Sequence, residues 1–373
     1  MACGGSAPPA IAPEPTPEPA PLPEPPPLPR AEVPRSYAAL DTGAVRVTVF
    51  VATTRRGAAS ERPGERFGGD DADSLQFAAV GVNVPSYRVR GVGELPRPSS
   101  ISSAFRSGPD PRREFFVTSV IPADSARFVQ RIAADLADTR SREALVFVHG
   151  FNVSFEDAAV RAAQLAADMS FDGAVVVFSW PSAGSVTAYV RDLQAARNAG
   201  FHLLRLVRNI VPAAQPDRIH LLGHSMGSEV IGKAAALVTP ADSAARFAQV
   251  VLAAPDIDAR VFRRELLPVL VAHSGRVTLY ASSDDDALRA SRAVSGVWRL
   301  GLGGDSLTVV DGMDTIDATR VRGDALGHTL FGNAGFLSDL ALLVGEGRPP
   351  GERRLLPVRR GDLTFWRFRG DPR

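Results

Sequence analysis

The chain has 373 residues, 45% of them hydrophobic and 22% charged, so it is long enough to bury a large core. Its formal net charge of +1 excludes a global attraction to nucleic acid or to acidic partners. The single cysteine, Cys3, excludes an internal disulfide and a cysteine-based metal site. The sequence contains no run of about 18 apolar residues, the length that a membrane-spanning helix needs.

Residues 1–34 differ in composition from the rest of the chain. They hold 13 of the 30 prolines, which favours a disordered, extended polyproline tether over a packed core. Met1-Ala2-Cys3-Gly4-Gly5-Ser6 resembles the junction of a bacterial lipoprotein, although the apolar residues that precede such a cysteine are not in the sequence. Two interpretations stay open. Either Cys3 is lipidated and associates the protein with a membrane of the cell envelope, on its periplasmic or extracellular face, or the tail is incidental and the protein is cytoplasmic.

Strands and helices alternate from residue 44 onward, which is typical of a mostly parallel sheet covered by helices. The pattern predicts strands at 45–52, 77–84 and 114–120, separated by loops at 55–75 and 86–113. Further strands are expected at 144–148, 174–178, 218–222, 249–254, 276–280 and 306–310. Helices are expected at 125–137, 155–169, 188–211, 228–237 and 259–271, with a last one near the C-terminus.

The stretch Gly223-His224-Ser225-Met226-Gly227 lies between a predicted strand and a predicted helix. In that context G-x-S-x-G forms a nucleophile elbow, a turn so tight that the residues flanking the serine must be nearly free of side chain. The turn places the serine beside a helix N-terminus, where N–H groups favour a developing oxyanion. The motif therefore predicts Ser225 as a catalytic nucleophile, with a structural turn serine as the alternative.

A serine hydroxyl needs a base, usually a histidine that a carboxylate orients. In the α/β-hydrolase arrangement the order along the chain is Ser, acid, His, which leaves His273 and His328 among the six histidines. His273 ends the helix before strand 276–280, on the wrong side of any acid from that strand. His328 lies in a loop after the last predicted strand, so we predict it as the base.

The acid has several candidates. Asp284-Asp285-Asp286 follows strand 276–280, the position of the orienting carboxylate, so one of the three should face His328 while the others are solvated or cap the next helix. Asp256, after strand 249–254, is a competitor that could instead cap the helix at 259–271. A calcium site is disfavoured because no regularly spaced carboxylate loop follows, and we expect no metal.

An oxyanion hole needs two backbone donors. We expect them to be the N–H of Met226, directly after the nucleophile, and the N–H of Phe151, in the loop after strand 144–148. His149 in that loop is interpreted as a residue that fixes the loop by hydrogen bonding rather than as a second base. Asn152 and Trp180 are expected at the substrate-binding pocket, Asn152 also as a buttress of the loop; a packed turn is the alternative for Trp180.

Several of these segments together resemble an uncharacterised bacterial α/β-hydrolase family, known as domain of unknown function 900. The similar segments are 50–55, 147–158, 178–182, the elbow, 252–258, 280–288 and Gly327-His328. The resemblance covers about residues 44–345. It implies an α/β-hydrolase fold, with a mostly parallel central sheet and helices on both faces, and an esterase- or lipase-like serine hydrolase. The aspartate of the family's Ser-Ser-x-Asp-x-Ala-Leu pattern falls on Asp285, which the resemblance favours as the acid.

The last segment, 346–373, is a basic and aromatic tail. It holds seven arginines from Arg353 onward together with Phe365, Trp366 and Phe368. Such a segment can rest on an anionic membrane surface, but we favour an extra strand or a frayed end.

The sequence therefore predicts a cofactor-free carboxylic ester hydrolase that acts on a small-molecule acyl ester through Ser225, Asp285 and His328. No nucleic-acid partner is expected, and nothing indicates the oligomeric state. A thioesterase or acyltransferase with the same triad, and a surface-tethered binding protein without catalysis, are the alternatives.

Overall fold

The computed structural model describes residues 37–40, 43–85, 109–183, 185–238, 246–321 and 327–369. Cys3, the proline-rich segment 1–34 and most of the predicted loop 86–113 lie outside these ranges. Within them, no helix has both the length and the apolar character that crossing a bilayer requires.

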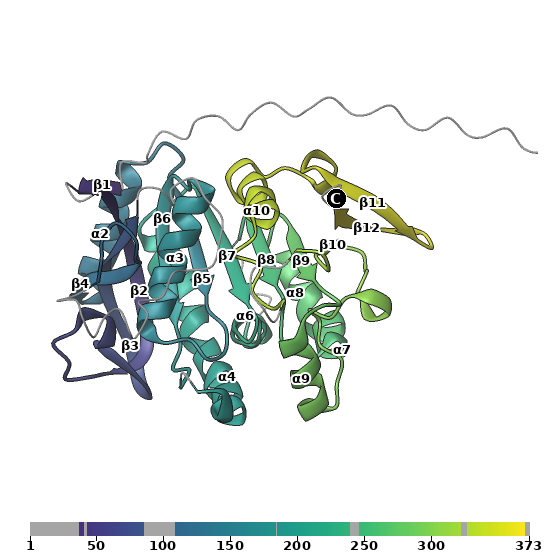
Figure 1. Ribbon diagram of the computed structural model, residues 1–373, viewed down its shortest axis with the longest axis horizontal. Helices are drawn as coiled ribbons and strands as arrows, with labels where there is room; N and C mark the ends of the chain where they lie inside the picture. The colour runs from purple at the N-terminus through teal and green to yellow at the C-terminus, as the bar shows by residue number, and fades with distance from the viewer. Residues whose placement is uncertain are drawn as a thin grey trace, which may run out of the picture. The chain divides into compact units, whose positions relative to one another are not determined.

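One sheet runs through the described part of the chain. Its strands are β1 Tyr37–Leu40, β2 Ala44–Gly57, β3 Phe67–Pro85, β4 Phe116–Ala123, β5 Glu143–Val148, β6 Gly173–Ser179, β7 Arg218–His224, β8 Gln249–Ala253, β9 Val277–Ala281, β10 Asp314–Asp317, β11 Leu355–Arg360 and β12 Leu363–Phe368. Their order is β11-β12-β10-β9-β8-β7-β5-β6-β2-β3-β4, with β1 paired to β2 (Figure 1). Neighbours from β2 to β12 along this order are parallel, and the outer pairs are antiparallel. The predicted mostly parallel sheet is confirmed.

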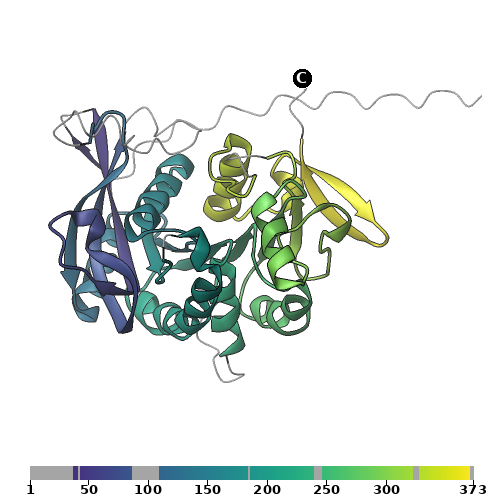
Figure 2. The same cartoon turned by 60° about the horizontal axis from the view of Figure 1, so that its bottom comes forward.

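Helices cover both faces of this sheet (Figure 2). They are α2 Ser125–Ala137, α3 Phe155–Met169, α4 Tyr189–Arg205, α5 Val211–Ala213, α6 Gly227–Ala236, α7 Ala259–Val261, α8 Leu267–Ala272, α9 Asp286–Ser295 and α10 Ala334–Glu346, with short 3-10 turns at Pro63–Glu65, Val186–Ala188, Gly304–Ser306 and Pro350–Glu352. Residues of α2, α4, α6 and α8 share one hydrophobic core, and residues of α3 and α10 share the other. The expected α/β architecture is therefore present.

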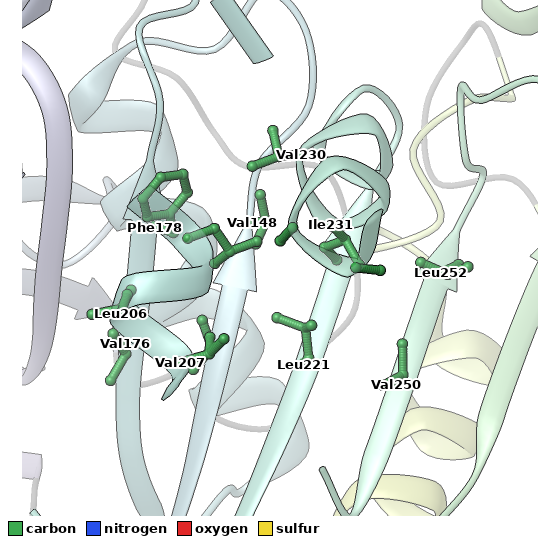
Figure 3. Packing of buried hydrophobic residues seen from close by; sticks show 14 of the residues in the cluster. Val148, Val176, Phe178, Leu206, Val207, Leu221, Val230, Ile231, Val250 and Leu252 are labelled. Atoms are coloured by element: carbon green, nitrogen blue, oxygen red, sulfur yellow. The ribbon is translucent and has the colours of Figure 1, made fainter. Parts of the chain in front are cut away.

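Strand β5 shows why a central strand must be apolar throughout. Val146 and Val148 belong to the core under α4 and α6, whereas Leu145 and Phe147 belong to the core under α3 and α10. Because successive side chains of a strand point to opposite faces, a strand covered twice loses the usual polar alternation. Figure 3 shows the first of these cores, where Val148 and Leu221 lie beneath the helix that carries Val230 and Ile231, and Val176 lies beside Leu206. Each fully buried side chain of this kind contributes about 1.5–3 kcal/mol.

Helices α2 and α3 have the predicted bounds because capping residues in the local sequence determine where they begin. Ser154 caps α3 by accepting from the Asp157 N–H, and Asp157 returns the bond to Ser154. Asp124 caps α2 by accepting from the Arg127 N–H. Such caps satisfy N–H groups that have no partner inside the helix.

The predicted helix at 188–211 is interrupted. After α4 the chain makes a π-helical turn at Leu206–Ile210 and resumes as α5. The helix expected at 259–271 is likewise divided by a π-helical turn at Phe262–Leu266. A proline, Pro212 or Pro268, comes two residues after each turn. Since proline has no N–H and its ring clashes with the carbonyl four residues earlier, a wider turn accommodates it.

Two predictions were wrong. Much of the loop expected at 55–75 is strand, because β2 extends to Gly57 and β3 begins at Phe67; this largely exposed arm needs no regular apolar pattern. The strand expected at 306–310 is not in the sheet. The strand that pairs with β9 is β10, which follows a turn at Gly312 with φ of +82°. The charged residues Asp314 and Asp317 at the ends of β10 hide the apolar pattern of a strand.

The basic, aromatic tail forms the extra strands that were favoured above. β12 pairs with β10 and β11 pairs with β12. Arg353, just before this hairpin, is buried and bonds to Asp339 at 2.9 Å and to the Tyr280 hydroxyl at 3.1 Å. These contacts anchor the hairpin to α10 and β9.

The partly buried carboxyl of Asp135 gives a test of how α2 packs on the sheet. Burial, reinforced by the charges of Asp138 and Asp172, raises the pKa of Asp135 to about 7. The folded protein therefore holds this proton more tightly than the unfolded chain, and stability falls as pH rises from about 4 to 7. We expect Asp135→Asn to stabilise the protein more at pH 8 than at pH 5, as measured by urea denaturation. The exposed Asp362 in the β11–β12 turn supplies the control, Asp362→Asn. Equal effects of Asp135→Asn at both pH values would contradict the prediction.

Candidate active site

Ser225 occupies a strained turn between β7 and α6. Its φ of +52° lies in the left-handed region, which a non-glycine residue adopts at a cost of about 1–2 kcal/mol. The conformation is held on both sides: the Ser225 N–H donates to the Ala253 carbonyl at 3.0 Å, and the Ser225 carbonyl accepts from the N–H groups of Ser228 and Asp256. This is the geometry predicted for a nucleophile elbow.

The glycines of the elbow are required by close contacts. A Cβ at position 227 would lie 2.5 Å from the carbonyl oxygens of both Val148 and His149, and one at position 223 would lie 2.5 Å from the Ile231 side chain. Gly150, in the loop after β5, approaches Ser225 in the same way, since a Cβ there would lie 2.8 Å from the Ser225 Cβ. The turn and the loop after β5 are therefore packed backbone to backbone.

Asp285 and His328 are brought together by the fold. The Nδ1 of His328 lies 2.7 Å from Oδ2 of Asp285, whose side chain is fully buried. The other carboxylate oxygen accepts from the Leu288 N–H at 2.8 Å and caps α9. Because both oxygens are fixed, the carboxylate can orient the imidazole with its proton on Nδ1, which leaves Nε2 as the basic atom.

The other acid candidates have different partners. Asp286 is exposed and pairs with Arg289, and Asp284 accepts from the Ser283 hydroxyl. Neither caps α9, because Asp285 itself has that role. The helix expected at 259–271 is capped by Asp258, not by Asp256.

Asp256 belongs to a buried polar cluster beside the elbow. Its carboxylate accepts from the Ser291 hydroxyl at 2.6 Å and the Tyr189 hydroxyl at 2.9 Å, and lies 3.1 Å from Nε of Arg299. Burial, followed by the negative charge of Asp256, raises the pKa of Tyr189 to about 12, so this hydroxyl stays protonated. The Tyr189 ring also packs edge-on against Phe151, 5.5 Å between centroids. The cluster thus joins α4 and α9 to the serine turn.

The two expected oxyanion donors face no competing acceptor. Across the described residues, neither the Phe151 N–H nor the Met226 N–H has a hydrogen-bond partner. Met226 stands directly before the first turn of α6, and Phe151 follows Gly150. Unpaired N–H groups at a helix N-terminus and in an adjoining loop are the donors that an oxyanion requires.

His149 holds the loop after β5 and has no accessible surface for proton transfer. Its Nδ1 donates to the Gly150 carbonyl at 2.8 Å, and burial together with the Arg55 charge lowers its pKa to about 3. The ring stacks on Trp180, whose indole N–H donates to the His149 carbonyl at 2.8 Å. Trp180 has no exposed surface, so in this structure it supports the loop and does not line an open pocket. Asn152 is exposed, with φ of +57°.

His224 lies next to His328, and its role was not predicted from the sequence motif. Its ring centroid lies 5.0 Å from those of His328 and Phe331. Burial, and then the charge of His328, lowers the pKa of His224 well below its usual value. The uncharged ring of His224 therefore lies beside both His328 and the core residue Phe331. Among the described residues, no group of three or more His, Cys, Asp or Glu side chains is placed to hold a metal ion.

The comparison with protein families agrees with this geometry. Residues 124–344 match the family model described as "Alpha/beta hydrolase of unknown function (DUF900)". The chain belongs to this α/β-hydrolase family. The matched range contains Ser225, Asp285 and His328, which follow one another in the chain order Ser, acid, His that is typical of α/β hydrolases.

Other comparisons add little. No curated protein matches the sequence of this hydrolase significantly. Among solved structures, it is similar to the phospholipase PlaB from Legionella pneumophila in complex with thio-NAD, at 12% sequence identity and a TM-score of 0.30. That match covers 60% of this chain and 66% of that chain.

Gly227 provides a test of the elbow. We expect Gly227→Ala to lower the free energy of unfolding by about 1–3 kcal/mol, because the added Cβ overlaps two backbone oxygens that cannot rotate away. Gly345→Ala in α10 is the matched control, since nothing lies within 4 Å of its Cβ; that change should stabilise the helix by up to about 1 kcal/mol. Urea denaturation measures both, and a Gly227→Ala protein as stable as the wild type would refute the close packing.

Proposed function

We propose that this α/β hydrolase is a serine esterase that cleaves carboxylic esters of small molecules through an acyl-enzyme on Ser225. The 2.7 Å contact between His328 Nδ1 and Asp285 Oδ2 is the observation that carries the proposal. Hydrogen bonds of this kind orient a histidine whose other nitrogen takes a proton from a nucleophile. The left-handed elbow at Ser225 and the unpaired N–H groups of Phe151 and Met226 support it.

The chemistry follows from these groups. Ser225 Oγ bonds to the carbonyl carbon of the ester while its proton passes to Nε2 of His328. The negative charge that develops on the carbonyl oxygen accepts hydrogen bonds from Phe151 and Met226 N–H. His328 then gives its proton to the alcohol oxygen as the bond between that oxygen and the carbonyl carbon breaks, which leaves the acyl group on Ser225 Oγ. A water molecule gives a proton to His328 Nε2 as its oxygen bonds to the acyl carbon, and His328 returns this proton to Ser225 Oγ as the acyl–Oγ bond breaks and the carboxylic acid leaves.

Carboxylic esters are proposed because they demand least of the leaving group. A thioester or an acyl acceptor other than water uses the same groups, so thioesterase and acyltransferase activities are the related alternatives. A non-catalytic binding protein is the alternative from another class. Treatment with a fluorophosphonate, which phosphonylates activated serines, separates the serine enzymes from the binding protein.

The first test replaces the nucleophile. We expect wild-type protein to be labelled by a fluorophosphonate probe and to hydrolyse short p-nitrophenyl esters, and Ser225→Ala to lose both properties. Labelling that persists in Ser225→Ala would show that another residue is the nucleophile. A folded wild-type protein that is neither labelled nor active would favour the binding protein.

The second test concerns the acid. Asp285→Asn should lower kcat by on the order of 10⁴-fold, because the imidazole loses its orientation and the imidazolium its counter-charge. Asp286→Asn, at an exposed carboxylate, should leave kcat within about twofold of wild type. Asp256→Asn should mainly reduce thermal stability, since it leaves buried Arg299 without its ion pair. A larger fall in kcat for Asp256→Asn than for Asp285→Asn would reverse the assignment.

A further inference from the structure

Arg55, at the end of β2, is a buried arginine that touches three segments around the site. Its Nε donates to the Ser179 hydroxyl at 2.9 Å, and Nη1 donates to the carbonyls of Ser182 at 2.9 Å and Gly68 at 3.0 Å. Nη2 donates to the Val153 carbonyl at 2.7 Å. The guanidinium thus joins the loop after β5, the loop after β6 and the start of β3.

This placement is costly for a charged group. Arg55 is 1% exposed, and burial lowers its pKa to about 10, although the charges of Asp192 and Asp157 oppose that shift. Its bonds go to carbonyl and hydroxyl oxygens, and Nη2 also lies 3.5 Å from Nε2 of His149; these uncharged partners compensate the charge only in part. If this position required only packing, an apolar side chain would fill it without the cost of burying a charge.

The pairing of β2 with β3 is irregular around Arg55. The pairing of β2 with β3 shifts register between Thr53 and Arg55 and again between Arg55 and Gly57. Irregularities of this type re-aim a side chain and are common next to active sites. Thr53 completes the turn, since its hydroxyl accepts from the Arg55 N–H and donates to the Ser179 carbonyl.

The loop that contains Phe151 is held at both ends. At its start, the His149 carbonyl accepts from Trp180. At its end, Val153 is bound through both backbone groups: its carbonyl accepts from Arg55, and its N–H donates to the Ser182 hydroxyl at 3.3 Å. The Ser182 hydroxyl in turn donates to the buried carboxylate of Asp192 at 2.6 Å. The unpaired Phe151 N–H lies between these two fixed points.

We propose that Arg55 is a positioning residue for catalysis, which fixes the 149–153 loop so that the Phe151 N–H points at the oxyanion. The inference rests on the proposed esterase function and assigns a role to a residue outside the matched range 124–344. A misplacement of about 1 Å, caused by a change away from the reacting atoms, can cost about 10²-fold in rate. Arg55 therefore acts on kcat through Phe151, without touching the substrate.

The test compares Arg55→Lys and Arg55→Gln with wild type, using a p-nitrophenyl ester and counting competent sites with a fluorophosphonate. Loss of one oxyanion donor lowers kcat by about 10²–10³-fold. We expect kcat per titrated site to fall by at least about tenfold in Arg55→Lys and further in Arg55→Gln, with KM within about threefold of wild type. A trifluoromethyl ketone, whose carbonyl carbon bonds to Ser225 Oγ and whose oxygen becomes an oxyanion, should bind more weakly in proportion to the fall in kcat/KM.

Arg353→Lys is the matched control, because Arg353 is equally buried but bonds to Asp339 and Tyr280, away from the loop. It should lower the melting temperature and leave kcat per titrated site within about twofold. If Arg55→Lys behaves in the same way, Arg55 is merely structural and the proposal fails. Since Ser225→Ala tests the esterase separately, the two failures are distinguishable.

A milder variant decides the matter if both Arg55 variants fail to fold. Ser179→Ala removes the acceptor of Arg55 Nε and leaves the guanidinium in place. We expect a roughly threefold to tenfold fall in kcat per titrated site, with a matching loss of ketone affinity. Unchanged values of both in a folded Ser179→Ala protein would overturn the proposal.

Discussion

The left-handed backbone of Ser225 is the constraint on which the site depends. A φ of +52° is unfavourable for serine, and it persists because bonds to Ala253 and Asp256 fix the peptide groups around it. The same turn requires glycine at 223 and 227, because helix α6 and strand β5 leave no room for a Cβ. The tight turn also sets the Met226 N–H free, since a residue at the start of a helix has no intrahelical acceptor. One local conformation therefore fixes the position of Ser225 and leaves the Met226 N–H without an acceptor among the described residues.

The two halves of the site are supported by different parts of the sheet. Asp285 and His328 follow β9 and β10, and the fully buried carboxylate is held by the helix that it caps. The loop with Phe151 is held from the other direction, by Arg55 on β2 and Trp180 after β6. Between them lies the Asp256 cluster, which contacts the serine turn through the Asp256 N–H and Phe151 through the Tyr189 ring. Rigid support from separate strands is how a fold holds reacting groups in register.

The sequence predicted the features that local patterns encode. Capping residues mark the ends of α2 and α3, and the glycine spacing marks Ser225; chain order and position marked His328. The choice of Asp285 over Asp284 and Asp286 came from the family resemblance, because three consecutive carboxylates look alike until one is buried against His328. Arg55 and Tyr189 were not found, since their partners are 98 and 67 residues away along the chain. The wrong prediction of a strand at 306–310 has a related cause. The segment that pairs with β9 is the shorter β10, which has a charged residue at each end, so apolar alternation did not indicate it.

The boundaries of the fold are wider than those of the matched family segment. Residues 124–344 contain Ser225, Asp285 and His328, but β6 pairs with β2 and β10 pairs with β12, both outside that range. Without β2, the parallel edge of β6 would be open, and the Ser182 and Val153 carbonyls would lose the donor that satisfies them. Without the C-terminal hairpin, buried Asp339 would lose Arg353. The three residues of the candidate triad thus lie in the matched segment, whereas strands from both ends of the described chain complete the sheet that holds them.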